Sequence, residues 1–299
     1  MASFGSPAAF QQAPINFSVP TPSPQPPALY PKYQPLNPGT GIPGVTLVTE
    51  VNASSPPIFY VPNLLSPAEC SALISAGQRH GFAPSNVVGD EPIANASPGT
   101  SEGLIAQPKV SQARTSTTLY LDRADTPSII SRVTALLNVA PSQCELPQVA
   151  QYLPSQKYDA HFDAFDVSTP NGRAFCANGG QRIATVLIYL NDVEEGGRTS
   201  FPRAVWRKDV TQGAQPNPID GGSFPAGGPG VSIKPRAGSA VVFFPSYYTY
   251  TETGQRSAVL DPLALHRAED AVDVKYVSQV WIREGEYRGV PSCRLQQPI

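Results

Sequence analysis

Short apolar segments that follow one another from residue 148 to residue 282 constrain the fold of this chain most strongly. They are rich in Val, Ile, Tyr and Phe, and turn-forming residues separate them, as in β-strands joined by turns. The segments are 148–153, 157–165, 182–190, 199–205, 230–235, 239–245 and 274–282. The chain also has 34 prolines, too many for a mainly helical protein. We therefore predict an α+β fold, mainly β, with a double-stranded β-helix (jelly-roll) core and helices packed on one face.

A first helix is predicted ahead of these strands. Ser66 is suited to the N-cap position, Pro67 to the first turn, and Glu69 completes a capping box. The helix should stop near Gly81. His80 then lies in the last turn, where a positive charge is favourable, and we interpret it as a helix-end residue rather than a metal ligand.

A second helix is predicted over residues 127–138, with Thr126 as its cap and Pro127 in its first turn. Residues 83–110, between the two helices, are polar and rich in Gly, Pro, Asn and Ser, so we expect a long loop. Loops of this length inside a compact domain are usually functional lids or mobile segments.

The domain organisation follows from composition. Residues 1–44 contain many prolines and one charged residue, Lys32, so this Pro-rich N-terminal segment is expected to be flexible. Residues 45–290 should form one domain, and residues 291–299 a C-terminal tail.

Charge and cysteine content exclude several classes of partner and site. A net charge of -2 gives no reason to expect nucleic acid as a partner, and no segment is long enough to span a membrane. The first 20 residues lack the features of a secretory signal, so a cytoplasmic location is expected if the chain is full length. Four widely spaced cysteines favour reduced thiols over a zinc site or a disulfide framework.

A His-x-Asp pair, His161 and Asp163, lies within segment 157–165. On a strand, side chains two residues apart point to the same face, which places an imidazole beside a carboxylate. Two histidines and one carboxylate bind a divalent metal and leave coordination positions open. The third ligand is predicted to be His266, which stands nine residues before Lys275 and near the start of another strand.

The region from about residue 58 to residue 287 resembles the catalytic domain of prolyl 4-hydroxylases, which are iron(II)- and 2-oxoglutarate-dependent oxygenases. The segments that carry the resemblance are NLLSPAEC, ARTSTTLYL, QYLPSQKYDAHFDAF, GGQRIATVLIYLNDVEEGGRTSFP, GVSIKPRAGSAVVFFP and the final H-x8-K-x5-W. They follow one another in the order found in the family.

The resemblance implies a complete set of cofactor-binding residues. For iron(II) they are His161, Asp163 and His266, and for 2-oxoglutarate they are Lys275, Tyr152 and Thr199. An ammonium and two hydroxyls can supply charge-assisted hydrogen bonds to the distal carboxylate of 2-oxoglutarate. O2 is the implied oxidant, and ascorbate is the expected reductant.

The resemblance also implies a substrate-binding wall. Its residues are Arg114, Ser116, Glu145, Tyr158, Arg182, Trp281 and Arg283. Arg283 stands where the family often has a histidine, so its contact with substrate is expected to differ. Purely structural alternatives are a pair between Arg114 and Glu145 and a core role for Trp281.

The resemblance predicts oxidation of an unactivated C–H bond, with conversion of 2-oxoglutarate and O2 to succinate and CO2. One hypothesis is hydroxylation of a prolyl residue in a peptide or protein. Another is hydroxylation, desaturation or cyclisation of a free amino acid or an amino-acid-derived metabolite, which Arg283 and the long loop favour. A non-catalytic binding protein on the same fold is a third hypothesis. The sequence leaves the oligomeric state open.

Overall fold

The structure is a computed structural model that describes residues 33, 44–85, 112–207, 219–220 and 230–299. Most of the predicted N-terminal segment therefore lies outside the described residues. The predicted loop at 83–110 also lies outside them, except for its first three residues, two of which form the short strand β3 (Ala83–Pro84). Within the described ranges, no helix has the length and apolar character needed to cross a membrane.

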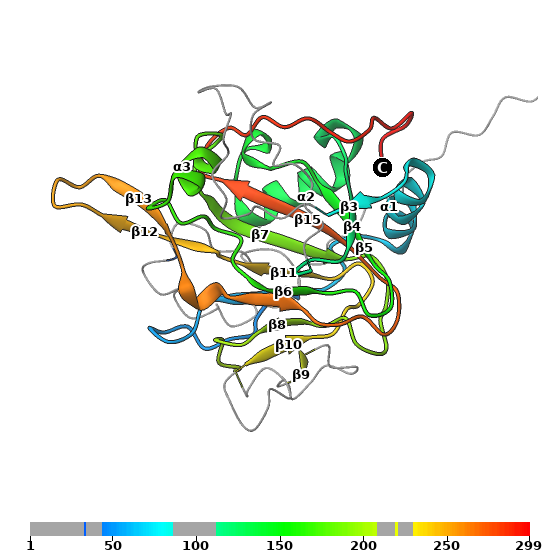
Figure 1. Cartoon of the computed structure of the whole chain (residues 1–299), viewed down its shortest axis with the longest axis horizontal. Helices are drawn as coiled ribbons and strands as arrows, with labels where there is room; N and C mark the ends of the chain where they lie inside the picture. The colour runs from blue at the N-terminus through cyan, green and yellow to red at the C-terminus, as the bar shows by residue number, and fades with distance from the viewer. Residues whose placement is uncertain (1–32, 34–43, 86–111, 208–218, 221–229) are drawn as a thin grey trace, which may run out of the picture.

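Two antiparallel sheets form the core (Figure 1). The larger sheet consists, in spatial order, of β1 (Thr46–Leu47), β2 (Ile58–Val61), β11 (Ala240–Phe243), β7 (Arg182–Tyr189), β15 (Lys275–Arg283), β5 (Gln148–Tyr152), β4 (Thr117–Tyr120) and β3. The smaller sheet consists of β6 (Tyr158–His161), β14 (His266–Ala268), β8 (Thr199–Phe201), β10 (Val231–Ile233) and β9 (Ile219–Asp220).

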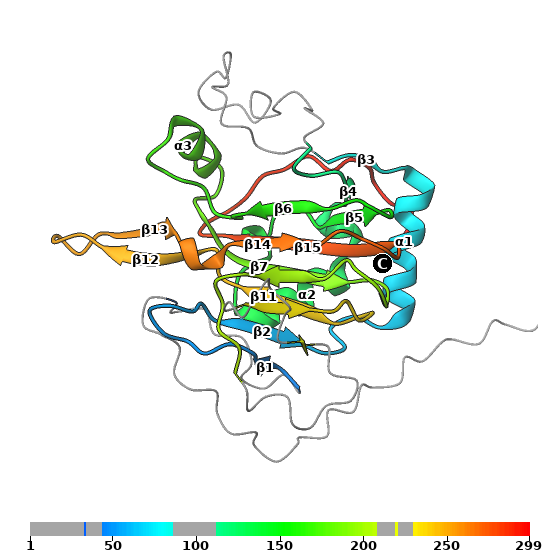
Figure 2. The same cartoon turned by 60° about the horizontal axis from the view of Figure 1, so that its bottom comes forward.

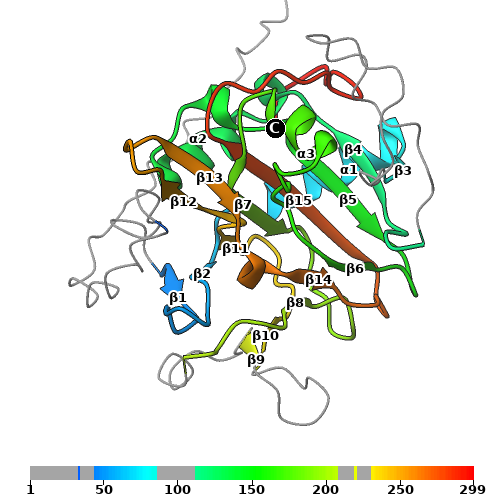
Figure 3. The same cartoon turned by 60° about the vertical axis from the view of Figure 1, so that its left-hand side comes forward.

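The chain crosses repeatedly between the two sheets. It passes from β5 to β6, from β7 to β8, from β10 to β11 and from β14 to β15, and each crossing joins one sheet to the other. This alternation confirms the predicted double-stranded β-helix. Strands far apart in the sequence thereby face one another across the space between the sheets (Figure 3).

The two predicted helices, α1 (Pro67–His80) and α2 (Pro127–Leu137), cover the face of the larger sheet that points away from the smaller one (Figure 1). The capping box of α1 is confirmed, because the Ser66 hydroxyl accepts from the Glu69 amide and the Glu69 carboxylate accepts from the Ser66 amide. The predicted cap of α2 is wrong in its chemistry. The Thr126 hydroxyl donates to the Asp122 carbonyl instead of capping the helix.

The two faces of strand β7 pack into two different apolar cores. Ala184, Val186 and Ile188 belong to the apolar core under the helices, whereas Leu187 and Tyr189 belong to the core between the sheets. Because side chains alternate along a strand, a strand buried on both faces reads as a continuous apolar run. The run at 182–190 in the sequence has this origin.

Three further parts surround the core. The hairpin of β12 (Ser246–Tyr250) and β13 (Arg256–Leu260) extends beyond the sheets, and α3 (Pro170–Cys176) lies near it (Figure 2). Single turns of 3-10 helix occur at η3 (Arg123–Asp125), η4 (Pro141–Gln143) and η6 (Pro262–Ala264). The C-terminal residues are tied to the body, since the Ile299 amide donates to the Asp125 carbonyl.

Gly238, in the turn before β11, is expected to be essential for stability. Its φ is +78°, and an added Cβ would lie 2.2 Å from the Leu65 carbonyl oxygen. Gly254, at the hairpin tip, is a matched control, because its φ is +79° but nothing lies within 4 Å of an added Cβ. We expect Gly254→Ala to lower the free energy of unfolding by about 1 kcal/mol through backbone strain. Gly238→Ala should cost a further ~1–3 kcal/mol through the clash.

Chemical denaturation of both variants measures this difference directly. Equal losses of unfolding free energy would show that the close approach of Gly238 to the residue 65 carbonyl has no energetic consequence.

Candidate metal centre

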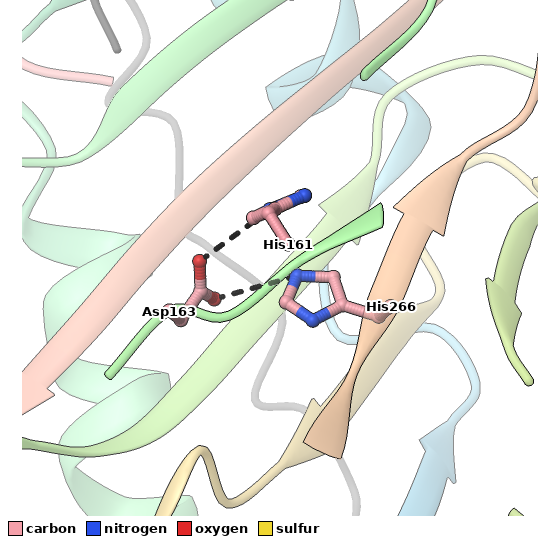
Figure 4. Close-up of side chains that lie close together, drawn as sticks. All are labelled: His161, Asp163 and His266. Carbon is pink, nitrogen blue, oxygen red and sulfur yellow. Dashed lines mark ion pairs between the residues drawn. The ribbon is translucent and has the colours of Figure 1, made fainter. Parts of the chain in front are cut away.

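His161, Asp163 and His266 converge between the two sheets (Figure 4). The Asp163 carboxylate faces both rings from one side, with one oxygen 3.7 Å from His161 Nε2 and the other 3.7 Å from His266 Nε2. The potential ligand atoms of all three residues lie within 4.8 Å of one another. Two imidazoles and one carboxylate in this arrangement can hold one divalent metal ion.

The pairing of β14 with β6 brings the two histidines together. His266, the first residue of β14, is the direct antiparallel partner of His161, the last residue of β6. The expectation that Asp163 shares this strand is wrong. The strand ends at His161, and Asp163 lies in a bend beyond it, so strand alternation does not position the carboxylate.

A hydrogen bond from β7 orients the carboxylate instead. The Thr185 hydroxyl donates to Asp163 Oδ2 at 2.8 Å, and the Arg182 guanidinium donates to the Asp163 carbonyl at 3.4 Å. Burial would raise the pKa of Asp163, but His266, His161, Arg182 and the Thr185 hydroxyl together outweigh burial and hold it below its usual range. Asp163 is therefore an ionised carboxylate, the form that binds metal.

Backbone carbonyls orient both imidazole rings. His161 Nδ1 lies 2.8 Å from the Asp159 carbonyl oxygen, and His266 Nδ1 lies 3.0 Å from the Ala264 carbonyl oxygen. A proton on each Nδ1 satisfies these carbonyls and leaves the Nε2 lone pairs available to a metal. Burial, with a smaller contribution from His266, lowers the pKa of His161 to about 3, so the ring is neutral at physiological pH.

The donor set fits iron(II). His266 Nε2 is buried and has no hydrogen-bond partner among the described residues. A buried polar atom without a partner is costly, so a metal bound at this point would satisfy it. Imidazole and carboxylate together suit iron(II) in sites that leave several coordination positions open.

Lys275 lies in the same cleft as the two histidines, together with the other residues expected to bind 2-oxoglutarate. It is 1% exposed, and Nζ lies 5.2 Å from the centre of the Tyr152 ring, which belongs to the residue directly opposite on β5. Burial lowers the pKa of Lys275 to about 7, against a smaller raising effect of Glu269. Thr199 completes the predicted set, and its buried hydroxyl has no hydrogen-bond partner among the described residues.

Tyr189 is a buried neighbour of Lys275 that was not predicted from the sequence. Its hydroxyl is fully buried and lacks a hydrogen bond of ordinary geometry, and the Lys275 ammonium lies 5.8 Å from its ring centre. Burial raises the pKa of Tyr189, and the Thr199 hydroxyl beside it only partly opposes this effect. Its spacing of four residues from Thr185 on one strand was the available signal, because both side chains then point to the same face.

Part of the expected substrate wall lies next to His161. The Tyr158 ring stacks on the His161 ring, with centroids 3.5 Å apart, and the Arg114 guanidinium lies 4.8 Å from the centre of the Tyr158 ring. Arg114 donates to the Ser116 hydroxyl at 3.1 Å and to the Gln148 side-chain oxygen at 2.7 Å. These three expected residues, Arg114, Ser116 and Tyr158, therefore form one group.

The remaining expected residues form a second group around Glu145. Its carboxylate accepts two hydrogen bonds from Arg182, at 2.7 and 2.9 Å, and one from Arg283, at 2.5 Å. The Arg182 guanidinium stacks on the Trp281 ring at 4.0 Å. The alternative of a pair between Arg114 and Glu145 is thus wrong, because Glu145 pairs with these two other arginines.

Arg283 supports this wall through buried contacts. It is 3% exposed, and besides Glu145 it donates to the carbonyls of Phe175 and Gly180. The guanidinium thereby links the larger sheet to the end of α3. These contacts give Arg283 a structural role, and the expectation that it also contacts substrate stays a prediction.

Glu145→Gln is expected to lower the free energy of unfolding by about 3–5 kcal/mol, because it leaves two buried guanidinium groups without a carboxylate. Burial would raise the pKa of Glu145, but Arg182 and Arg283 hold it below its ordinary value of 4.5. The stabilisation is therefore complete above about pH 4.5 and is lost as the pH falls through the lowered pKa. Denaturation at pH 7 and at pH 3.5 measures both effects.

Glu194→Gln is the matched control, since Glu194 also pairs with two cations, Lys234 and Arg236, but on the surface. It should change stability little. A loss as small in Glu145→Gln as in this control would contradict the energetic role of the buried cluster.

Comparison with known proteins agrees with this site. Residues 147–283 match the 2OG-Fe(II) oxygenase superfamily. The chain is 32% identical over 251 residues to probable prolyl 4-hydroxylase 3 of Arabidopsis thaliana, which spans 80% of this chain and 74% of that protein. It is 31% identical over 244 residues to prolyl 4-hydroxylase 1 of the same plant, which spans 79% of this chain and 71% of that protein.

Among solved structures, the viral collagen prolyl hydroxylase of Paramecium Bursaria Chlorella virus-1 in its 2OG complex is 23% identical. The match has a TM-score of 0.44 and covers 76% of this chain and 95% of the viral one. The sequence relationship to the plant proteins shows the family: this chain belongs to the prolyl 4-hydroxylase family of dioxygenases, which use iron(II), 2-oxoglutarate and O2.

Proposed function

We propose that this chain hydroxylates a prolyl residue in a peptide or protein, through a domain formed by residues 45–290. The observation that carries the proposal is the convergence of His161, Asp163 and His266, two of which line one cleft together with Lys275. The names of the plant relatives, which are prolyl 4-hydroxylases, supply the substrate class.

In this proposal His161, Asp163 and His266 hold iron(II). Bound iron, with 2-oxoglutarate and O2, supplies the oxidising power that breaks an unactivated C–H bond and yields succinate and CO2. The protein keeps the His161 imidazole neutral and holds the Asp163 carboxylate ionised. Backbone carbonyls fix the directions of both imidazole rings, and Thr185 fixes the direction of the carboxylate. Such preorganisation reduces the rearrangement needed when the metal binds.

Lys275, Tyr152 and Thr199 bind 2-oxoglutarate, and we add Tyr189 to this group. A distal carboxylate placed among them would pair with the buried ammonium and accept from the hydroxyls of Thr199 and Tyr189 that have no hydrogen bond of ordinary geometry. Low exposure of the cleft keeps water away from these interactions and strengthens them.

The substrate wall has two parts in this proposal. Arg114, Ser116 and Tyr158 lie on the side of His161, and Arg182 and Trp281 lie on the side of Asp163. Glu145 and Arg283 act behind the second part as positioning residues.

The hypothesis of a free amino acid as substrate loses one of its grounds. Arg283 differs from the residue that the family often has, but its guanidinium is engaged by Glu145 and by two backbone carbonyls. The substitution is therefore accounted for by internal contacts and does not by itself indicate a smaller substrate.

His161→Ala and Asp163→Ala should abolish succinate formation and weaken metal binding by at least about tenfold, because each removes one of three ligands. Titration with Co(II), followed by its visible absorption, measures metal binding independently of turnover. His80→Ala is the control, since this histidine lies at the end of α1 outside the cleft. Full metal affinity in either ligand variant would contradict the assignment.

The lowered pKa of Lys275 leads us to expect that 2-oxoglutarate binds more weakly as the pH rises. In the protein without 2-oxoglutarate, the Lys275 amine is charged below about pH 7 and neutral above about pH 7. Above that pH the amine must therefore take up a proton when the dianion binds. The Kd should rise roughly 20-fold between pH 6.5 and pH 8.5. Anaerobic calorimetry measures this change.

Two variants separate charge from hydrogen bonding. Lys275→Met should bind 2-oxoglutarate weakly at both pH values, with the pH dependence lost. Tyr189→Phe should also bind more weakly but keep the pH dependence, because it retains the amine. A wild-type Kd that is the same at both pH values would rule out an ion pair with Lys275.

A further inference from the structure

Arg114 is a buried cation whose hydrogen-bond partners among the described residues are all neutral. It is 5% exposed, yet its two hydrogen bonds go to the Ser116 hydroxyl and the Gln148 side-chain amide. In the part of the chain that the structure describes, no carboxylate pairs with it, and no hydrogen bond uses Nη1. A guanidinium removed from water without an opposing charge is costly.

The other buried arginines near the metal centre are treated differently. Arg182 and Arg283 share the Glu145 carboxylate, which neutralises part of their charge. Gln148 stands opposite Arg114 at the corresponding distance, 2.7 Å, but carries no charge. The site therefore retains one positive charge at Arg114 that no carboxylate in the described ranges pairs with.

Arg114 lies beside the reaction centre. Its guanidinium packs on one face of Tyr158, whose ring stacks on His161, so a single aromatic ring separates it from a metal ligand. The segment around Arg114 also lies along the outer edge of β6, since the Asp159 amide donates to the Ala113 carbonyl and the Thr115 amide donates to the Lys157 carbonyl. Backbone pairing thus fixes the segment, and the hydrogen bonds to Ser116 and Gln148 hold the guanidinium in position.

The geometry points to Arg114 as the binding site for a carboxylate of the substrate, next to the proline that is oxidised. A carboxylate can accept hydrogen bonds from the unused Nη1 edge and balance the buried charge. The inference rests on the proposed prolyl substrate and narrows it to an acidic one. The carboxylate comes either from an acidic side chain adjacent to the proline or from a free α-carboxyl group on it.

Two pairs of ligands test this site and separate the two sources. The first pair is acetyl-Gly-Pro-Glu-Gly-amide and its Gln counterpart, and the second is acetyl-Gly-Pro with a free carboxylate and its amide. Binding to the protein loaded with iron(II) and 2-oxoglutarate is measured by calorimetry without O2. We expect the acid to bind about tenfold or more tightly than its neutral counterpart in at least one pair.

Two variants test whether Arg114 causes the preference for the acidic ligand. Arg114→Gln removes the charge, and Gln148→Glu supplies an internal carboxylate to Arg114, so each should bring the affinity ratio of acid to neutral ligand close to one. Arg288→Gln, which removes a guanidinium whose side chain is 82% exposed, is the control and should keep the wild-type ratio. The ratio is measured within each variant, and the wild-type comparison stands even if one variant fails to fold.

The carboxylate site is overturned if the wild-type protein binds the acid and its neutral counterpart with equal affinity in both pairs, or if it binds none of the four ligands. A preference that survives in both variants at Arg114 and Gln148 also overturns it. The same mixtures are then exposed to O2 and analysed for hydroxyproline by mass spectrometry. Acid-dependent binding without hydroxyproline would leave the carboxylate site standing and contradict the proposed prolyl hydroxylation.

Discussion

The pairing of β14 with β6 is the contact on which the site depends. It sets His266 directly opposite His161, although more than a hundred residues separate them in the sequence. In the described sheet β6 is an edge strand with β14 as its neighbour, and the segment around Arg114 covers its other side through backbone hydrogen bonds. An edge covered in this way is protected from fraying and from pairing with other chains. The same cover places a guanidinium beside the metal ligands.

The alternation of side chains along β7 and β15 links the fold to the chemistry. On β15, Val280 and Ile282 pack under the helices, whereas Lys275 and Trp281 point into the space between the sheets. A shift of one residue in the pairing would exchange the two faces, bury a charge under the helices and remove it from the cleft. The helices pack only against the apolar face of β15. They therefore help to fix the pairing register that directs Lys275 into the cleft.

The sequence predicted the features that rest on local chemistry and periodicity. The double-stranded β-helix, the capping box at Ser66 and the start of a strand at His266 are of this kind. It predicted Asp163 as a ligand but wrongly placed it on the strand, because the chain leaves the strand after His161 and long-range hydrogen bonds from Thr185 and Arg182 fix the bend. It missed the hairpin β12–β13, whose half-exposed strands, SYYTY and RSAVL, contain only a short apolar run at the end of the second. Tyr189 was not predicted as a binding residue, because a tyrosine within an apolar strand is usually part of the core.

The balance of buried charge explains why the cleft can be both stable and ready to bind. Around Glu145 the protein supplies its own counterion, so that wall holds its shape without a ligand. Around Lys275 the only counter-charge in the described part of the chain is Glu269, which acts at a distance and accepts a hydrogen bond from Ser200, so the effect of burial dominates. Buried donors without partners lower the stability of the free protein. An anion that binds among them supplies the missing partners, and this pairing contributes to its affinity. The charged groups therefore divide by role: those with internal partners shape the site, and those without select what enters it.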